Sequence, residues 1–149
     1  VIFIFYERMK KMKVTYEDLT KELKDKNIRL SHQRLKILEF ITNNNVHPTV
    51  DQIYSELHTV IPTLSKTTVY NSLKALIDAG LVKVINIEDN ETRYDIINHD
   101  HGHFKCESCG EIYDFEINIK NLNSKDLNDF KINHRDVYFK GICPQCIKE

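Results

Sequence analysis

Apolar residues in the first half of the chain recur with the spacing of amphipathic helices. Leu19 and Leu23 lie one helical turn apart among charged residues, and Thr15 precedes them as an N-cap, which predicts a helix over residues 14–26. Ser31 begins a second segment with the same spacing, and this segment ends in a run of asparagines. The buried stripe expected of the second helix consists of Leu35, Leu38 and either Ile37 or Ile41.

Two more helices are predicted after a turn at Pro48, because proline disfavours helix in the residue before it. The first of them covers residues 50–58. The second begins at the N-cap Ser65, runs to Ala79 and stops at Gly80, a residue typical of helix ends. The side chains expected to be buried are Ile53, Tyr54 and Leu57 in the one, and Val69, Leu73, Leu76 and Ile77 in the other.

β-branched and apolar residues replace the helical pattern at 81–87. A similar stretch at 91–97 follows the polar turn 88–90, so the two stretches are expected to pair as a hairpin. A hairpin placed after three helices with short turns is typical of a winged helix-turn-helix domain, a common DNA-binding architecture. We therefore predict an α+β fold whose winged helix-turn-helix domain covers residues 14–97.

The last third of the chain combines strand patterns with one short helical pattern. Alternating apolar residues predict a strand over 111–119, and a second strand is expected over 137–143. A short helix is predicted between them, over 122–130. Residues 98–149 are thus interpreted as a small α/β domain, and the unpaired edge of its sheet favours a homodimer.

All four cysteines of the chain occur in two Cys-x-x-Cys pairs, which are Cys106 with Cys109 and Cys143 with Cys146. Four thiolates in two such pairs form a tetrahedral shell suited to zinc, and Gly110 is placed as the turn residue of the first pair. Two disulfides, a redox dithiol, a rubredoxin-like iron site and unrelated buried cysteines are the alternatives. We expect structural zinc at these four positions.

A second set of metal ligands is expected around the first cysteine pair. In a strand, His101 and His103 would point to the same side, and Asp114 follows closely. His47 and Asp95 belong to the predicted DNA-binding half, where each taken alone reads as an ordinary surface residue. Three imidazoles and two carboxylates without a thiolate suit Fe2+ or Mn2+.

The net charge of −1 excludes a broadly cationic binder of polyanions, but it conceals an asymmetry. Residues 1–90 carry 13 Lys and Arg against 11 Asp and Glu, whereas residues 91–149 carry 8 against 11. A nucleic-acid surface is therefore expected in the first part.

The outward positions of the fourth helix offer cations for phosphates, an amide that can pair with adenine, and methyl and ring surfaces for thymine. An ordinary solvated helix face is the alternative. Arg93, on the second strand of the hairpin, is a weaker candidate for DNA contact. The expected DNA-binding residues are Arg29, Lys66, Thr67, Thr68, Tyr70, Asn71 and Lys74.

The chain opens with an apolar run over residues 1–6, which is far too short to span a bilayer, and no small-residue cleavage site follows it. We interpret residues 1–13 as an extension that is disordered or not native. Without an export signal the expected location is cytoplasmic, where thiols stay reduced.

Five segments resemble the ferric uptake regulator (Fur) family, in order and with matching spacing over nearly the whole chain beyond residue 14. They are 29–34 (Arg-Leu-Ser-His-Gln-Arg), 47–49 (His-Pro-Thr), 68–70 (Thr-Val-Tyr), 101–110 (His-Gly-His-Phe-Lys-Cys-Glu-Ser-Cys-Gly) and 143–146 (Cys-Pro-Gln-Cys). The resemblance implies an N-terminal winged helix, a C-terminal dimerisation domain, a structural four-cysteine zinc and a regulatory metal at the hinge. His32 departs from the family, whose members generally carry proline there, and it should loosen the start of the second helix.

The peroxide-sensing branch of the family, PerR, resembles the chain at each expected regulatory ligand: His47, Asp95, His101, His103 and Asp114. Iron-sensing members usually place Glu at the position of Asp114, and Asn71 after Tyr70 is also similar to the peroxide branch. A second metal site of some iron sensors needs a His-Asp pair where this chain has Asp100 and Gly102. That site is expected to be absent.

The resemblance implies a repressor that binds a palindromic operator in double-stranded DNA when Fe2+ or Mn2+ fills the regulatory site. Peroxide would then oxidise His47 or His101 in a metal-catalysed reaction and release the DNA, whereas manganese would not support this reaction. The alternatives are an iron-level sensor that responds to occupancy alone, a mononuclear iron enzyme and a zinc-stapled interaction module. The sequence offers no recognisable substrate pocket, so no enzyme activity is expected, and peroxide is the one small molecule expected as a signal.

Overall fold

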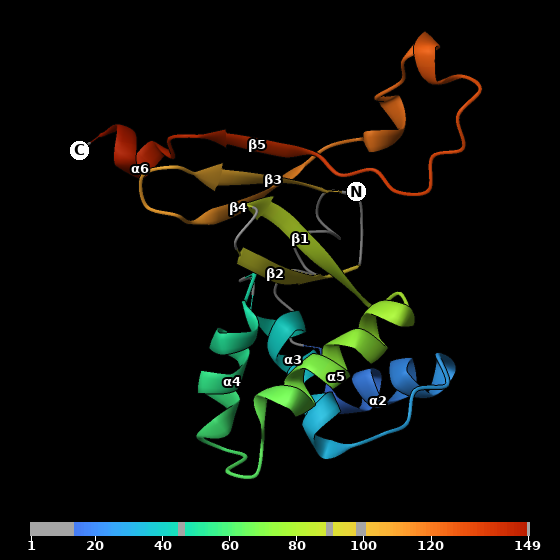
Figure 1. The fold of residues 1–149 in the computed structure, drawn as a ribbon, viewed down its shortest axis with the longest axis vertical. Helices are drawn as coiled ribbons and strands as arrows, with labels where there is room; N and C mark the ends of the chain where they lie inside the picture. Colours follow the sequence, from blue (N-terminus) through green and yellow to red (C-terminus); the bar gives the residue numbers. More distant parts are fainter. Residues whose placement is uncertain (1–13, 45–46, 89–90, 98–100, 149) are drawn as a thin grey trace. The chain divides into compact units, whose positions relative to one another are not determined.

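The computed structural model describes residues 14–44, 47–88, 91–97 and 101–148 (Figure 1). The chain divides after Ile97 into two compact units, here called unit 1 and unit 2. The predicted extension 1–13 lies outside the described residues, as do residues 89 and 90 of the predicted hairpin turn.

The described part of unit 1 opens with four helices, each of which follows a capping side chain. Thr15, Ser31, Thr49 and Ser65 each accept a hydrogen bond from a backbone N–H in the first helical turn, which satisfies a group that the helix leaves unpaired. The helix at His32 therefore begins as predicted despite the missing proline. The helices are α2 (Tyr16–Asp25), α3 (His32–Asn43), α4 (Val50–His58) and α5 (Lys66–Asp78).

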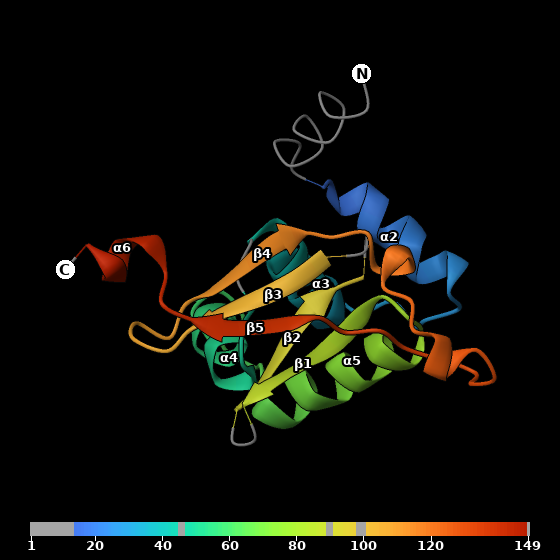
Figure 2. The ribbon, with the colours of Figure 1, turned by 90° about the horizontal axis from the view of Figure 1, so that it is seen from above.

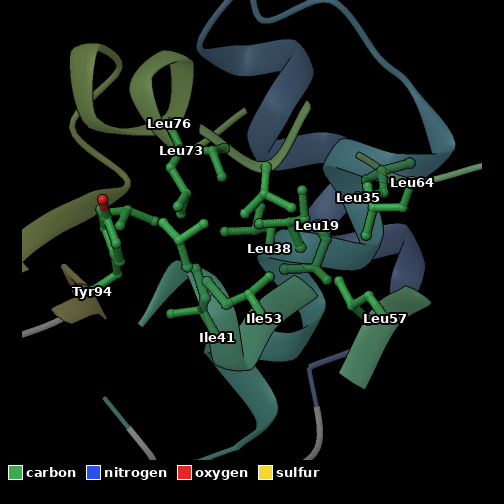
Figure 3. Packing of buried hydrophobic residues seen from close by; sticks show 14 of the residues in the cluster. Leu19, Leu35, Leu38, Ile41, Ile53, Leu57, Leu64, Leu73, Leu76 and Tyr94 are labelled. Atoms are coloured by element: carbon green, nitrogen blue, oxygen red, sulfur yellow. The ribbon is translucent and has the colours of Figure 1, made fainter. Parts of the chain in front are cut away.

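The apolar stripes of these helices form one core in unit 1 (Figure 3). The predicted buried residues of α2, α3, α4 and α5 lie in it, except that Tyr54 and Ile77 pack against its edge. Ile37 and Ile41 are both buried, so the choice between them was unnecessary. Packing against this core fixes the orientation of α5. The face of α5 that points away from the core is therefore exposed.

The predicted hairpin consists of β1 (Val82–Glu88) and β2 (Glu91–Ile96), paired antiparallel. Tyr94 of β2 enters the core, and its backbone N–H donates to the Pro48 carbonyl at 3.0 Å. Because side chains alternate along a strand, Glu91, Arg93 and Asp95 share the other face of β2. The hairpin is thereby joined to the turn that precedes α4.

Unit 2 is a three-stranded sheet in the order β4-β3-β5 (Figure 2). Its strands are β3 (His101–Cys106), β4 (Ile112–Glu116) and β5 (Tyr138–Gly141). β3 pairs antiparallel with β4 and parallel with β5. A one-turn helix, α6 (Pro144–Ile147), follows β5. This helix was not predicted, although proline is typical of a first helical turn.

The helix predicted over 122–130 is wrong. Within these residues the structure has one short 3-10 turn, η2 (Lys125–Leu127), and another, η1 (Ile119–Asn121), comes just before them. The Ser124 hydroxyl accepts a hydrogen bond from Asp126 and caps η2 for a single turn. Asn, Ser and Asp side chains in this stretch compete for backbone hydrogen bonds, which outweighs its weak apolar spacing. The flanking strands are also shorter than predicted.

Gly102 is the second residue of β3 and lies opposite Phe115 of β4. A Cβ atom at Gly102 would approach the Phe115 ring to 2.2 Å, a distance that no side chain tolerates. The Phe115 ring in turn stacks on Phe139 of β5, with ring centroids 4.9 Å apart. Glycine is therefore what allows these two rings to lie across the central strand.

Unit 2 buries very little apolar surface by itself. Among the described residues of unit 2, the buried hydrophobic side chains are Cys106 and Cys143. Many large apolar side chains of this unit are exposed: Leu122, Leu127, Phe130, Ile132, Phe139, Ile142 and Ile147. In the part of the chain that the structure describes, no helix has the length and apolar character needed to cross a membrane.

We expect Val69→Ala to lower the free energy of unfolding by about 1–3 kcal/mol, because the lost methyl groups leave a cavity in the core. Val69 is 0% exposed, whereas Val60 in the loop after α4 is 68% exposed and provides a matched control. Val60→Ala should change this free energy by less than about 0.5 kcal/mol. Urea unfolding followed by helical circular dichroism measures both, and equal losses would contradict the packing.

Candidate metal centres

Four sulfur atoms meet at one end of the sheet in unit 2. Cys106 ends β3, Cys109 lies in the turn to β4, and Cys143 and Cys146 belong to the start and body of α6. Their Sγ atoms all lie within 4.8 Å of one another. Gly110 has φ +80°, the left-handed conformation that the predicted turn after Cys109 requires.

The spacing of these sulfurs fits a tetrahedral metal site and excludes a disulfide. A Zn–S bond of about 2.3 Å places neighbouring sulfurs about 3.8 Å apart. The Cys109 and Cys143 sulfurs are 3.9 Å apart, far beyond the S–S bond of about 2.05 Å, and all four cysteines are free. This cluster could therefore hold zinc.

The thiols of the cluster cannot all ionise easily without a cation. Backbone N–H groups of Cys109 and Cys143 donate to the Cys106 sulfur and lower its pKa to about 6. At Cys109 the backbone bond from Glu111 lowers the pKa, but burial and the neighbouring sulfurs together raise it to about 12. A bound dication would offset this rise of the Cys109 pKa, because it favours the thiolate form of each ligand.

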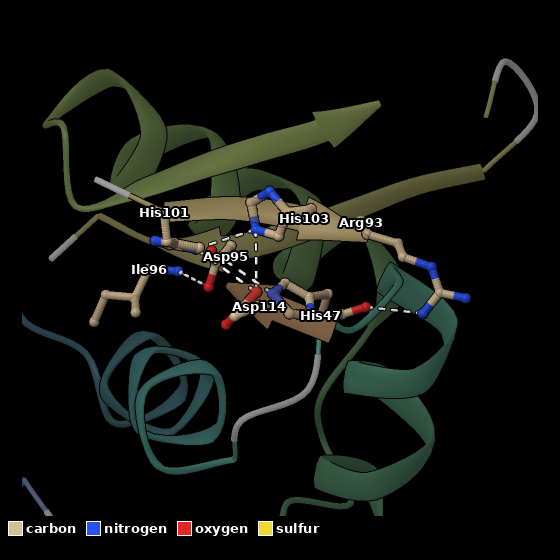
Figure 4. A network of polar contacts seen from close by, with 7 residues as sticks. All are labelled: His47, Arg93, Asp95, Ile96, His101, His103 and Asp114. Carbon is tan, nitrogen blue, oxygen red and sulfur yellow. Dashed lines mark hydrogen bonds and ion pairs between the residues drawn. The ribbon is translucent and has the colours of Figure 1, made fainter. Parts of the chain in front are cut away.

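Unit 2 also gathers two imidazoles and a carboxylate. His101 and His103 share one face of β3, and their Nε2 atoms are 3.1 Å apart (Figure 4). Asp114 stands opposite His103 in the β3–β4 register, and its Oδ1 lies 3.4 Å from the His103 Nε2 and 3.8 Å from the His101 Nε2. The predicted same-side arrangement of the two histidines is thus observed.

Unit 1 brings together its own imidazole and carboxylate. The His47 Nε2 lies 3.8 Å from the Asp95 Oδ2, although 48 positions of sequence separate the two residues. The other Asp95 oxygen accepts the Ile96 N–H at 2.8 Å, and Arg93 donates to the His47 carbonyl at 3.0 Å. A backbone N–H of β2 therefore orients the Asp95 carboxylate, and a side chain of β2 holds the backbone of His47.

The donor chemistry of both groups suits a hard or borderline divalent ion. Imidazole nitrogen and carboxylate oxygen are ligands of Fe2+ and Mn2+, and neither group contains a thiolate that would select a softer metal.

The candidate DNA-contacting residues of α5 are mostly exposed. Lys66, Thr67, Tyr70, Asn71 and Lys74 lie on the outer face, whereas Thr68 is half-buried with its hydroxyl 2.9 Å from the Ser65 hydroxyl. The exposed Arg29, before α3, accepts a hydrogen bond from Arg34 on its carbonyl.

Both α5 lysines pair with acids that the sequence analysis did not single out. Lys66 contacts Asp51 of α4 at 2.6 Å, and this hydrogen bond raises the Lys66 pKa. Lys74 contacts Asp78 one helical turn away at 2.9 Å. The second pair follows from the four-residue spacing, whereas the first depends on how α4 and α5 pack. Phosphate oxygens would compete with these carboxylates.

The model of the Ferric uptake regulator family matches residues 25–140 of the chain. The peroxide operon regulator of Bacillus subtilis (strain 168) is 37% identical over 131 residues, which cover 85% of this chain and 90% of that protein.

Two solved structures are also similar to the chain. That of PerR from Streptococcus pyogenes, described in terms of peroxide sensing and gene regulation, is 35% identical with a TM-score of 0.51, covering 88% of this chain and 92% of that one. The ferric uptake regulator of Helicobacter pylori has a TM-score of 0.74 at 21% identity, covers 92% of this chain and 97% of that one, and supports the fold alone.

We expect Cys109→Ser to release zinc to a colorimetric chelator much faster than the unaltered protein does, because a hydroxyl replaces one of four thiolates. Glu107→Ala is the control, since Glu107 is exposed in the same turn and offers no sulfur. Zinc content and release rate are measured on the purified full chain. Unchanged release from the serine variant would show that the cluster does not hold the metal.

Proposed function

Because this chain belongs to the ferric uptake regulator family, we propose that it is a metal-dependent DNA-binding repressor of transcription that senses peroxide. The observation that carries the proposal is the ligand set: each unit brings imidazole and carboxylate groups together, and one of these units presents a winged helix. The similarity to the peroxide operon regulator and to PerR favours peroxide as the signal. Residues 14–97 would form the DNA-binding domain and residues 98–149 the metal-binding dimerisation domain.

Two metal sites are assigned by this proposal. Cys106, Cys109, Cys143 and Cys146 hold a structural zinc, supported by the spacing of the four sulfurs. The regulatory Fe2+ or Mn2+ takes its ligands from both units: His47, Asp95, His101, His103 and Asp114. The free thiols fit the reducing cytoplasm, where we place the protein.

The DNA-binding surface is assigned to α5 and the segment before α3. Lys66, Lys74 and Arg29 would contact phosphates, and Asn71 with Tyr70 would reach base edges in the major groove. Thr67 and Thr68 complete the assigned face, with Thr68 in a positioning role because its hydroxyl contacts Ser65. Lys66 and Lys74 would have to leave Asp51 and Asp78 to contact phosphates. These lysine–phosphate contacts would make DNA binding sensitive to salt.

A homodimer on a palindromic operator follows from the same assignment. The exposed apolar side chains of unit 2 present more apolar surface than a small domain usually leaves in contact with water. A second copy of the chain would cover this surface. Two winged helices related by a twofold axis would then read two half-sites.

The ligand residues would connect metal occupancy to DNA binding. Residues from both units holding one ion would favour one arrangement of the two domains, and this arrangement would bind DNA. When bound, Fe2+ would activate peroxide by lending it electrons that the imidazole ring then returns. A ring C–H bond of His47 or His101 becomes a C–O bond, the peroxide O–O bond breaks, and water leaves. The altered imidazole no longer serves as a ligand, so the protein releases DNA.

In this proposal the protein is not an enzyme, because the oxidised histidine is consumed once and no product is turned over. An iron-level sensor is the second candidate, and the fate of the histidines distinguishes the two.

We expect Asp114→Ala and His47→Ala each to raise the Mn2+ concentration required for DNA binding at least about tenfold, because each removes one ligand. Asp126→Ala, which removes an exposed carboxylate of η2, is the control. Binding is measured by fluorescence anisotropy on a palindromic site selected from random DNA with the Mn2+ form. Undiminished metal dependence in both ligand variants would disprove the regulatory site.

Peroxide treatment of the Fe2+ form should add the mass of one oxygen atom to the peptide that contains His47 or His101 and should abolish DNA binding. The Mn2+ form serves as the control and should remain unmodified. Peptide mass mapping before and after treatment measures this. Loss of DNA binding without any histidine oxidation would instead favour a sensor of iron occupancy.

A further inference from the structure

Arg93 occupies the middle of the β2 face that carries Asp95. Its Nη1 donates to the His47 carbonyl at 3.0 Å (Figure 4), while its Nε and Nη2 donate to the Glu91 Oε2 at 3.1 and 2.9 Å. The guanidinium thus uses one edge to hold the backbone of His47 and the other edge to bind a carboxylate of its own strand. A planar fork of five N–H donors suits this double role, and a lysine could fill only part of it.

Three consecutive residues of β2 approach the His47–Pro48 turn. Arg93 binds the His47 carbonyl, the Tyr94 N–H binds the Pro48 carbonyl, and the Asp95 carboxylate lies 3.8 Å from the His47 imidazole. All of these groups belong to unit 1, so the arrangement does not depend on the other unit. The strand that carries one candidate ligand therefore also fixes the backbone of another.

The positive charge of Arg93 leads to the opposite expectation for metal affinity. A cation near a metal site weakens metal binding by Coulomb repulsion, and on that ground removing Arg93 would strengthen it. Glu91 opposes this effect, because its carboxylate contacts the guanidinium directly and makes the pair neutral. Positioning should then outweigh repulsion, since losing a group that orients a ligand typically costs about 10–100-fold in metal affinity.

We infer that Arg93 is a positioning residue for the regulatory metal, which fixes the His47 backbone so that the imidazole and the Asp95 carboxylate converge, and that Glu91 holds Arg93 in place. This inference rests on the proposed function, because it takes His47 and Asp95 as ligands. It replaces the expectation that Arg93 contacts DNA, since each of the three guanidinium nitrogens donates a hydrogen bond within unit 1.

The test uses the zinc-loaded full chain and Mn2+ alone as the probe, with affinity measured by isothermal titration. Arg93→Ala should weaken Mn2+ binding about 10–100-fold, and Arg93→Lys should recover part of the loss through one donor to the His47 carbonyl. Glu91→Gln should weaken binding less than Arg93→Ala does. Thr92→Ala is the matched control: Thr92 is exposed on the opposite face of β2, and its loss should leave the affinity unchanged.

A spectroscopic measurement separates positioning from a general loss of structure. The ligand-field absorption of Co2+ in the regulatory site should shift in Arg93→Ala, while zinc content and helical circular dichroism stay at the level of the unaltered protein. Mn2+ affinity in Arg93→Ala that is unchanged or higher would overturn the inference. A loss that Arg93→Lys does not recover, or an unshifted Co2+ spectrum, would overturn it as well.

His47→Ala distinguishes this failure from that of the proposed function. If His47→Ala leaves Mn2+ binding unchanged, the regulatory site itself is wrong. If His47→Ala weakens Mn2+ binding but Arg93→Ala does not, only the role of Arg93 is wrong.

Discussion

Unit 2 depends on its four cysteines more than on an apolar core. The hydrophobic cluster of the protein lies within unit 1, and the buried hydrophobic residues described in unit 2 are two of the sulfur ligands themselves. Small domains of this kind need a metal, a disulfide or a partner to be stable. A structural zinc contributes on the order of 10 kcal/mol to folding, comparable with the whole net stability of a domain. Metal and dimer partner would thus take the place of the missing core.

Strands, rather than helices, position the ligands in both units. The two-residue period of β3 places His101 and His103 on one face, and the antiparallel register brings Asp114 opposite them. In β2 the same period places Arg93 beside Asp95, and both contact the turn at His47. A strand held by its neighbours has little freedom to move its side chains, so the structure already brings each group of candidate ligands together.

The sequence predicted those features whose signals are local. Caps such as Ser31 and Ser65, the helical stripes and the cysteine pairs each depend on residues within a few positions of one another. The helix predicted over 122–130 is wrong because asparagine, serine and aspartate side chains offer the backbone hydrogen bonds that compete with those of a helix. The contact between Arg93 and the His47 carbonyl joins residues 46 positions apart, and no local pattern indicates it. Ligand types could be predicted, whereas the residues that hold them in place required the packed structure.

Gly102 limits how this protein can evolve. It separates the two histidines of β3 and faces the opposite side of the strand, where a Cβ atom would overlap the Phe115 ring. A mutation at Gly102 is therefore tolerable only after Phe115 has become smaller, and the smaller residue would give up the stacking on Phe139. Two substitutions would be needed. The change at Phe115 would be harmful alone, and the change at Gly102 would not be tolerated without it. Such a pair is an evolutionary barrier that keeps glycine between the two histidines of β3.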